Sequence, residues 1–88
     1  MEIEAIKVSS RSVPKSVAGA VCAAVRETGS ARVEAVGAGA VNQAVKAAAV
    51  ARVFLAGDGI DAVCIPEFEE LSVAGETKTG IKLTIEKR

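Results

Sequence analysis

The stretch Val36-Gly37-Ala38-Gly39-Ala40-Val41-Asn42-Gln43-Ala44-Val45-Lys46-Ala47 decides most of what the sequence says about the fold. It leaves a strand predicted over residues 32–36, turns through the small loop 37–39, and enters a helix predicted over residues 40–56. The glycines allow a tight turn and the close approach of a neighbouring segment. The stretch therefore predicts a strand–loop–helix unit.

A second unit of the same kind precedes it. Residues 3–8 are rich in β-branched side chains and predict a strand, followed by the polar loop 9–12. Residues 14–28 carry apolar side chains with helical periodicity, and Ser12 is the expected N-cap. Gly29 is expected to end this helix.

Strands alone are expected beyond the second helix. Residues 61–65 predict an apolar strand, and a proline with an acidic run then interrupts or extends it. Residues 77–86 predict the last strand, reached through a turn at 74–76. The predicted order is β-α-β-α-β-β in a single domain, residues 1–88. Two βα units predict parallel pairing of the first three strands, and the hairpin adds an antiparallel one.

Composition excludes several functions. The 88 residues have zero formal net charge and contain no His, Trp or Tyr and only two Phe. Histidine-dependent catalysis and imidazole metal sites are therefore absent, as is an array of aromatic rings for stacking bases. Cys22 and Cys64 lack a Cys-X-X-Cys spacing and are interpreted as reduced core thiols. We expect no enzyme activity, no metal and no cofactor.

Charge is unevenly distributed along the neutral chain. Residues 1–56 carry +3, residues 57–77 carry −6, and residues 78–88 carry +3. The acidic run of Glu67, Glu69 and Glu70 lies in the negative segment. Side chains alternate between the two faces of a strand, so we interpret this run as a solvated face rather than a metal cluster.

The loops that follow the first two strands form the candidate binding site. Parallel strands send such loops to one edge of the sheet, where the helix N-termini offer free N–H groups and partial positive charge. With the nearby cations they predict an anion-binding edge, and phosphate is the expected anion. The candidate residues are Ser10, Arg11, Lys15, Gly39, Asn42, Gln43 and Lys46. The alternatives are turn glycines, an asparagine that caps the helix, and solvated surface lysines.

The second helix is apolar nearly all round, which is typical of a helix covered on more than one side. Val50 and Val53 fall in or beside its narrow polar sector and are candidate oligomer contacts. Arg52 lies in the apolar arc and is expected either to pair with a buried carboxylate or to cross a subunit interface. The longest stretch without a polar side chain, residues 17–25, is too short to span a membrane, so we expect a cytoplasmic protein.

The sequence also resembles the stage V sporulation protein S family, and the resemblance covers essentially the whole chain. The motifs that carry the resemblance are Lys7-Val8-Ser9, Pro14-Lys15-Ser16-Val17-Ala18-Gly19-Ala20, the block 36–47, Cys64-Ile65-Pro66 and Ile81-Lys82-Leu83. That family is similar to Alba, the small archaeal chromatin protein. The resemblance implies an α+β two-layer fold, with two helices on one face of a mixed four-stranded sheet. It also implies homodimers or higher oligomers, a regulatory role in sporulation or development, and nucleic-acid binding.

The sequence differs from Alba at several basic positions. Alba carries paired lysines before the first helix, where this chain has Ser12-Val13, and basic residues before the second, where it has Gly37 and Gly39. We therefore expect weak, sequence-nonspecific contacts to the phosphates of DNA or RNA. The alternative is a protein-interaction or scaffold module that uses the same fold without nucleic acid. Either a dimer or a tetramer fits the sequence.

Overall fold

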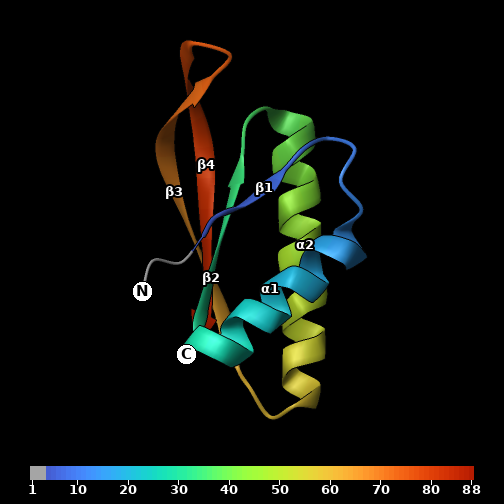
Figure 1. Cartoon of the computed structure of the whole chain (residues 1–88). Helices are drawn as coiled ribbons and strands as arrows, with labels where there is room; N and C mark the ends of the chain where they lie inside the picture. Colours follow the sequence, from blue (N-terminus) through green and yellow to red (C-terminus); the bar gives the residue numbers. More distant parts are fainter. Residues whose placement is uncertain (1–3) are drawn as a thin grey trace.

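The computed structural model describes residues 4–88 as a four-stranded sheet with two helices packed on one face (Figure 1). The elements, in chain order, are β1 (Ile6–Val8), α1 (Pro14–Thr28), β2 (Ser30–Ala35), α2 (Ala38–Gly57), β3 (Ala62–Val73) and β4 (Glu76–Lys87). This order confirms the predicted α+β fold. The beginning of the first predicted strand, at Ile3, lies outside the described residues.

The strand order in the sheet is β1-β2-β4-β3. β1 pairs with β2 in parallel, whereas β4 pairs antiparallel with both β2 and β3. The predicted parallel pairing of the first three strands is therefore right for two strands and wrong for the third. β4 takes a central place beside β2, where its Leu83 and Ile85 are buried, while the acidic β3 remains at the edge.

β3 runs unbroken through Pro66, which lies opposite Leu83 of β4. An edge strand tolerates proline because its outward N–H has no partner to lose. The proline and the acidic run thus extend the strand. Glu67 faces Lys82 across the pair, with Oε1 and Nζ 3.7 Å apart.

The prediction for α1 is right at its C-terminal end and wrong at its N-terminal end. Gly29 ends the helix with φ of 92°, as predicted, and its N–H donates to the carbonyl of Val25. At the start the predicted cap is wrong, because Val13 holds the N-cap position with no side-chain hydrogen bond. The Ser12 hydroxyl instead accepts a hydrogen bond from the N–H of Ser9 at 2.9 Å, so it closes the preceding loop.

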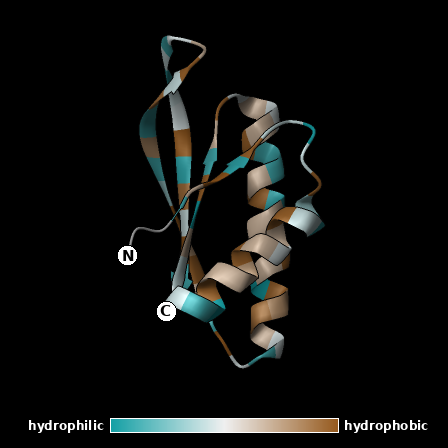
Figure 2. Ribbon diagram, in the orientation of Figure 1, coloured by the Kyte–Doolittle hydropathy of each residue, from teal (hydrophilic) through white to brown (hydrophobic). Residues whose placement is uncertain are grey.

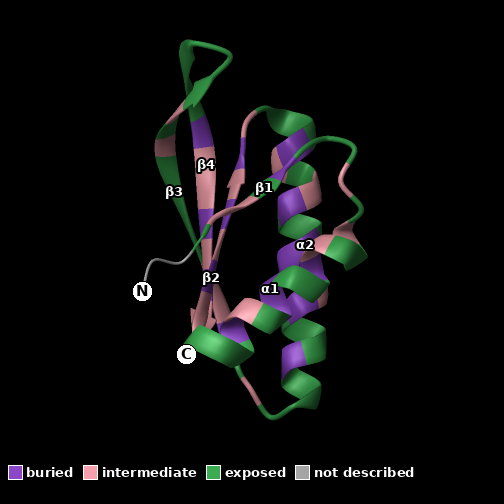
Figure 3. Cartoon of the chain, viewed as in Figure 1, coloured by how far each residue is buried: buried purple, intermediate pink, exposed green. Residues whose placement is uncertain are grey.

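The core is built from small side chains, which lets the two helices lie close to each other and to the sheet. The buried part of α2 consists of alanines and Leu55, while Val21 and Val25 come from α1 and Val33 from β2 (Figure 3). The apolar colouring of α2 in Figure 2 continues onto sides that Figure 3 shows as exposed. No helix within residues 4–88 is long and apolar enough to cross a membrane.

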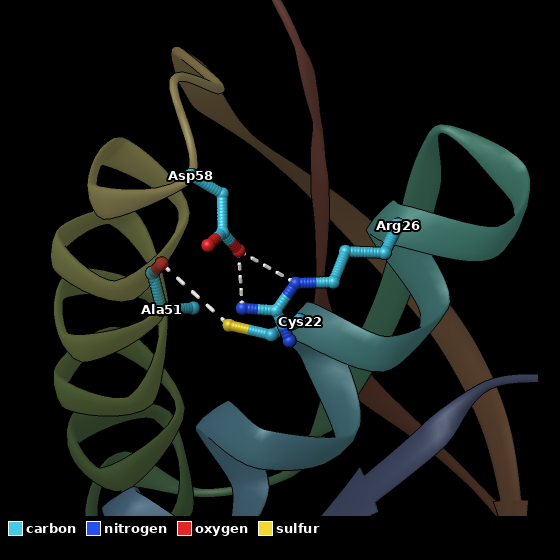
Figure 4. Close-up of polar contacts among 4 residues, drawn as sticks. All are labelled: Cys22, Arg26, Ala51 and Asp58. Atoms are coloured by element: carbon cyan, nitrogen blue, oxygen red, sulfur yellow. Dashed lines mark hydrogen bonds and ion pairs between the residues drawn. The ribbon is translucent and has the colours of Figure 1, made fainter.

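Ion pairs gather where α1 and α2 end. Arg26 of α1 donates from Nε to Oδ2 of Asp58, just after α2, at 2.8 Å (Figure 4). Arg52 donates from Nε to the carbonyl of Ala62 at 2.7 Å and lies 3.7 Å from Asp61. Arg52 therefore pairs with a carboxylate, but Asp61 is exposed, so the expectation of a buried carboxylate partner is wrong. We call this region, with Arg88 beside Asp61 at 3.3 Å, the paired end.

Both cysteines are free thiols, as predicted, but only Cys22 is buried, and Cys64 is half-buried. Cys22 is buried and donates from Sγ to the carbonyl of Ala51 at 3.6 Å (Figure 4). Burial raises the pKa of both the Cys22 and Cys64 thiols. A thiol with a raised pKa is a weaker nucleophile at neutral pH.

Candidate functional site

The loops that follow β1 and β2 lie side by side at the end of the molecule where α2 begins (Figure 1). A Cβ atom added to Gly39 would lie 2.9 Å from the Cβ of Ser10, so only glycine allows the two loops to touch. Gln43 donates from Nε2 to the carbonyl of Ser12 at 2.9 Å. The predicted juxtaposition is therefore present. We call this region, residues 9–13 and 36–46 with Lys15, the loop end.

Backbone N–H groups at the loop end come mainly from α2. The first backbone hydrogen bond of α2 runs from the N–H of Val41 to the carbonyl of Gly37. The N–H groups of residues 38–40 precede that bond and point out of the helix end. In α1 the N–H of Ser16 already bonds to Val13, and Pro14 has none. The start of α2 is thus the stronger anion-binding end of the two.

The predicted cations flank these loops and are exposed. Arg11 lies on the first loop, Lys15 on the first turn of α1, and Lys46 on α2. None of the ion pairs found within residues 4–88 involves these three side chains. Their charges are available to an external anion.

Asn42 and Gln43 have different roles. Asn42 is exposed and shares one face of α2 with Gly39 and Lys46, because residues three and four apart are neighbours on a helix. Gln43 is half-buried, and its amide joins α2 to the first loop. Gln43 therefore positions the loops, and Asn42 is the polar side chain that is free to contact a ligand.

A cavity of about 540 Å³ opens beside the two loops. Its lining residues are Lys7, Val8, Ser9, Ser10, Glu34, Val36, Gly37, Gly39, Ala40, Leu71, Ser72 and Val73. Sequence reasoning found the loop residues but missed Lys7, Glu34 and the hairpin residues. The alternation of side chains along β1 and β2 places Lys7 beside Glu34, but only once the parallel register is known.

Glu34 lies against Glu69 of the acidic run. Burial, followed by the hydrogen bond and negative charge of Glu69, raises the pKa of Glu34, while Lys7 and Arg32 oppose the shift. Atom Oε2 of Glu69 is buried and finds no hydrogen-bond partner among the described residues. The interpretation of the run as a solvated face is therefore wrong for Glu69.

The exposed side of α2 is largely apolar. Val45 is 51% exposed and Val53 is 70% exposed, and Ala49 and Ala56 lie on the same face. Val50 is half-buried and packs against the core, so it contributes mainly to the protomer itself. Of the two valines predicted as oligomer contacts, Val53 is the accessible one.

The described residues contain no cluster of metal-ligating side chains. Within residues 4–88 no group of three His, Cys, Asp or Glu side chains lies together in a way that could hold a metal ion. The polar groups at the loop end are instead N–H groups, hydroxyls, an amide and cations, with one carboxyl pair. Such a set is suited to binding an anion.

The fold defines the class of protein: it is Alba-like. The structure is similar to that of Alba from Thermoplasma volcanium, with a TM-score of 0.65 and 18% sequence identity over 96% of this chain and 100% of that chain. The sequence matches the family model of stage V sporulation protein S (SpoVS) over residues 4–88. The chain belongs to the stage V sporulation protein S family.

Proposed function

We propose that this protein is a weak, sequence-nonspecific nucleic-acid-binding oligomer that uses its loop end. The observation that carries the proposal is the contact between the two loops at Ser10 and Gly39, which brings the start of α2 and the exposed cations to one surface. The Alba-like fold supports it. We further propose a cytoplasmic, regulatory protein of the sporulation or development type, and a binding protein rather than an enzyme.

Binding is expected to depend on phosphates. Arg11, Lys15 and Lys46 supply positive charge, and the N–H groups that open α2 supply directed hydrogen bonds. Gly39, Asn42 and Lys46 extend the contact along one face of α2, about 10 Å from first to last. Contacts of this kind fix a backbone without reading its sequence.

A salt titration tests the proposal. If a dimer neutralises about four to six phosphates, the logarithm of the binding constant should fall against the logarithm of salt concentration with a slope of about −4 to −5 on duplex DNA. The binding of labelled DNA and RNA at several salt concentrations measures it. No binding at about 50 mM salt, or a flat response, would contradict the proposal.

Oligomerisation is part of the same proposal. The exposed apolar face of α2, with Val45 and Val53, is a surface that a second copy of the chain could cover. Two copies would double the number of phosphates within reach, and the affinity of weak sites rises steeply when they are linked. Light scattering of the purified protein at micromolar concentration measures the oligomeric state, and a monomer would contradict this part.

A protein-interaction module is the second candidate function. Besides the α2 face, Phe68 on the edge strand β3 is 84% exposed, and its neighbourhood is acidic. An exposed ring on an unpaired strand edge is typical of a protein contact. This function predicts a protein partner that is bound with little salt dependence and lost in the Val53→Asp variant. The salt titration separates the two functions.

A further inference from the structure

The cavity at the loop end has three different walls. Its apolar surface comes from Val36, which follows β2, and from Leu71 and Val73 on the β3–β4 hairpin. Gly37, Gly39 and Ala40, at the start of α2, bring the unbonded helix N–H groups to its rim. Lys7 and Glu34 supply opposite charges beside each other. A volume of about 540 Å³ is in the range of small-molecule sites.

Gly80 of β4 brings the apolar side chains together. A Cβ atom at Gly80 would lie 2.8 Å from the carbonyl oxygen of Ala35, 3.0 Å from Cγ2 of Val36 and 3.1 Å from Cδ1 of Leu71. Because Gly80 has no side chain, Val36, the residue after β2, and Leu71 of β3 approach each other across β4. The cavity wall is therefore built into the sheet, and it does not depend on a mobile loop.

Lys7 and Glu34 define the hydrogen bonds that a ligand must make. They are neighbours in the parallel register of β1 and β2, so a donor and an acceptor pair stand side by side. An ammonium offers only donors. The carboxyl of Glu34 hydrogen-bonds to Glu69, whose buried Oε2 has no hydrogen-bond partner among the described residues, so the two carboxyl groups together offer an excess of acceptors. The complementary ligand edge has one acceptor next to two donors. Guanine presents this order, with O6 followed by N1–H and the N2 amine.

We propose that the cavity takes an unpaired guanine base, with Lys7 on O6, Glu34 on N1–H and N2, one face of the base on the apolar wall of Val36 and Leu71, and its 5′-phosphate at the start of α2. This inference rests on the proposed function and names its preferred substrate class. In a duplex the same edge of guanine is occupied by cytosine. Single-stranded nucleic acid is therefore the better ligand, and guanosine 5′-monophosphate carries the whole recognised unit.

The first test uses nucleotides alone. Guanosine, adenosine, cytidine and uridine 5′-monophosphates are titrated into the full protein while backbone amide shifts are recorded by NMR. The proposal expects guanosine monophosphate to bind at least tenfold more tightly than the others and to shift residues 7, 34, 36–40 and 71. Equal affinity for the four nucleotides, or shifts confined to the exposed cations, would overturn it.

Glu34 and Glu67 lie on the same face of the sheet, and they supply a variant and its matched control. Glu34→Gln leaves an amide that cannot accept from both guanine donors, and is expected to weaken guanosine monophosphate binding at least tenfold. Glu67→Gln removes a carboxylate that pairs with Lys82 outside the cavity, and should leave binding unchanged. Equal losses in both folded variants would overturn the proposal. A folded Glu34→Gln variant that binds like the parent would overturn it too.

A second experiment, with nucleic-acid polymers in place of nucleotides, separates this inference from the proposed function. A single strand with unpaired guanines, its duplex form and a uridine-only strand are compared at one salt concentration. Tighter binding of the guanine strand supports the inference and identifies the polymer as the source of the ligand. Binding of guanosine monophosphate without this preference supports the cavity as a site for the free nucleotide. Equal binding of all three polymers, with no response to the nucleotide, overturns the inference while the proposed function stands.

Discussion

The two ends of the molecule use their charges in opposite ways. At the paired end Arg26, Arg52 and Arg88 lie within ion-pair distance of Asp58 or Asp61. At the loop end Arg11, Lys15 and Lys46 take part in none of the ion pairs found within residues 4–88. Because the net charge of the chain is zero, the negative charge that balances the two ends lies elsewhere, in part on the glutamates of the β3–β4 hairpin. We expect ligand binding at the loop end, where these cations take part in no ion pair within residues 4–88.

The comparison also separates stability from binding. Surface ion pairs contribute little to stability, typically about 0–1 kcal/mol each, so the paired end is held mainly by its buried side chains. The loop end has few large side chains and is held by backbone turns, the Ser12 hydroxyl and the Gln43 amide. Substitutions at the two ends should therefore affect different measurements.

The largest effect is expected from the buried side chain near the paired end. Leu55 is 0% exposed, and Leu55→Ala should lower the free energy of unfolding by about 2–5 kcal/mol. Binding by the fraction that remains folded should be unchanged, because Leu55 lies far along α2 from Gly39. Denaturant unfolding with a parallel binding titration checks both. A stability loss well below this range would mean that the core at this end is loosely packed.

Charge reversal sharpens the comparison most directly. Lys15→Glu combined with Lys46→Glu should weaken nucleic-acid binding more than tenfold and lower the salt slope by roughly one per lost phosphate contact. The thermal midpoint should hardly change, because both side chains are exposed. The control is Arg52→Glu combined with Arg88→Glu, which should lower stability and leave binding within about twofold. Equal binding losses in the two double variants would remove the distinction between the ends.

Two glycines give a smaller, opposed pair of effects. Gly39→Ala places a Cβ atom 2.9 Å from Ser10 and should push the loops apart, lowering affinity a few-fold. Gly19→Ala, in the middle of α1 with nothing within 4 Å of the added atom, should raise stability by about 1 kcal/mol without affecting binding. Thermal unfolding and the binding titration measure the pair. Unchanged binding by Gly39→Ala would show that loop contact is not needed.

The smallest effect expected is the pH-dependent contribution of the Glu34 carboxyl to stability. Its pKa is raised in the folded protein, so the folded state favours the protonated form, and the stabilisation this gives is lost as the pH rises through that pKa. Glu34→Gln should therefore raise the thermal midpoint slightly at neutral pH and have no such effect below the ordinary carboxyl pKa. Thermal scans across acid and neutral pH measure the difference. A stabilisation that is larger in acid would contradict the sign.

Local patterns predicted the local elements well. The periodicity of residues 14–28 and the glycine after them gave the bounds and the left-handed end of α1, and the glycine loop gave the start of α2 to within two residues. These features depend on neighbours in the chain, which the sequence shows directly. The loop juxtaposition followed because adjacent parallel strands send their loops to one edge.

Features that depend on distant neighbours were not predictable in this way. The position of β4 between β2 and β3 depends on competition among strands for the covered centre of the sheet. The cavity could not be predicted either, because Glu34, Leu71 and Gly80 meet only when the strands lie in this order. The Ser12 cap failed for a local reason, since the same hydroxyl can close a turn with Ser9 instead.

Amide shift mapping tests the central claim most directly. A short DNA or RNA oligonucleotide is titrated into the protein at low salt, and the shift of each backbone amide is followed by NMR. The loop-end account predicts that the largest shifts fall in residues 9–13, 15 and 36–46, and that they collapse at high salt. Shifts centred on Arg52, Asp58 and Asp61, or on the exposed face around Val53, would contradict it.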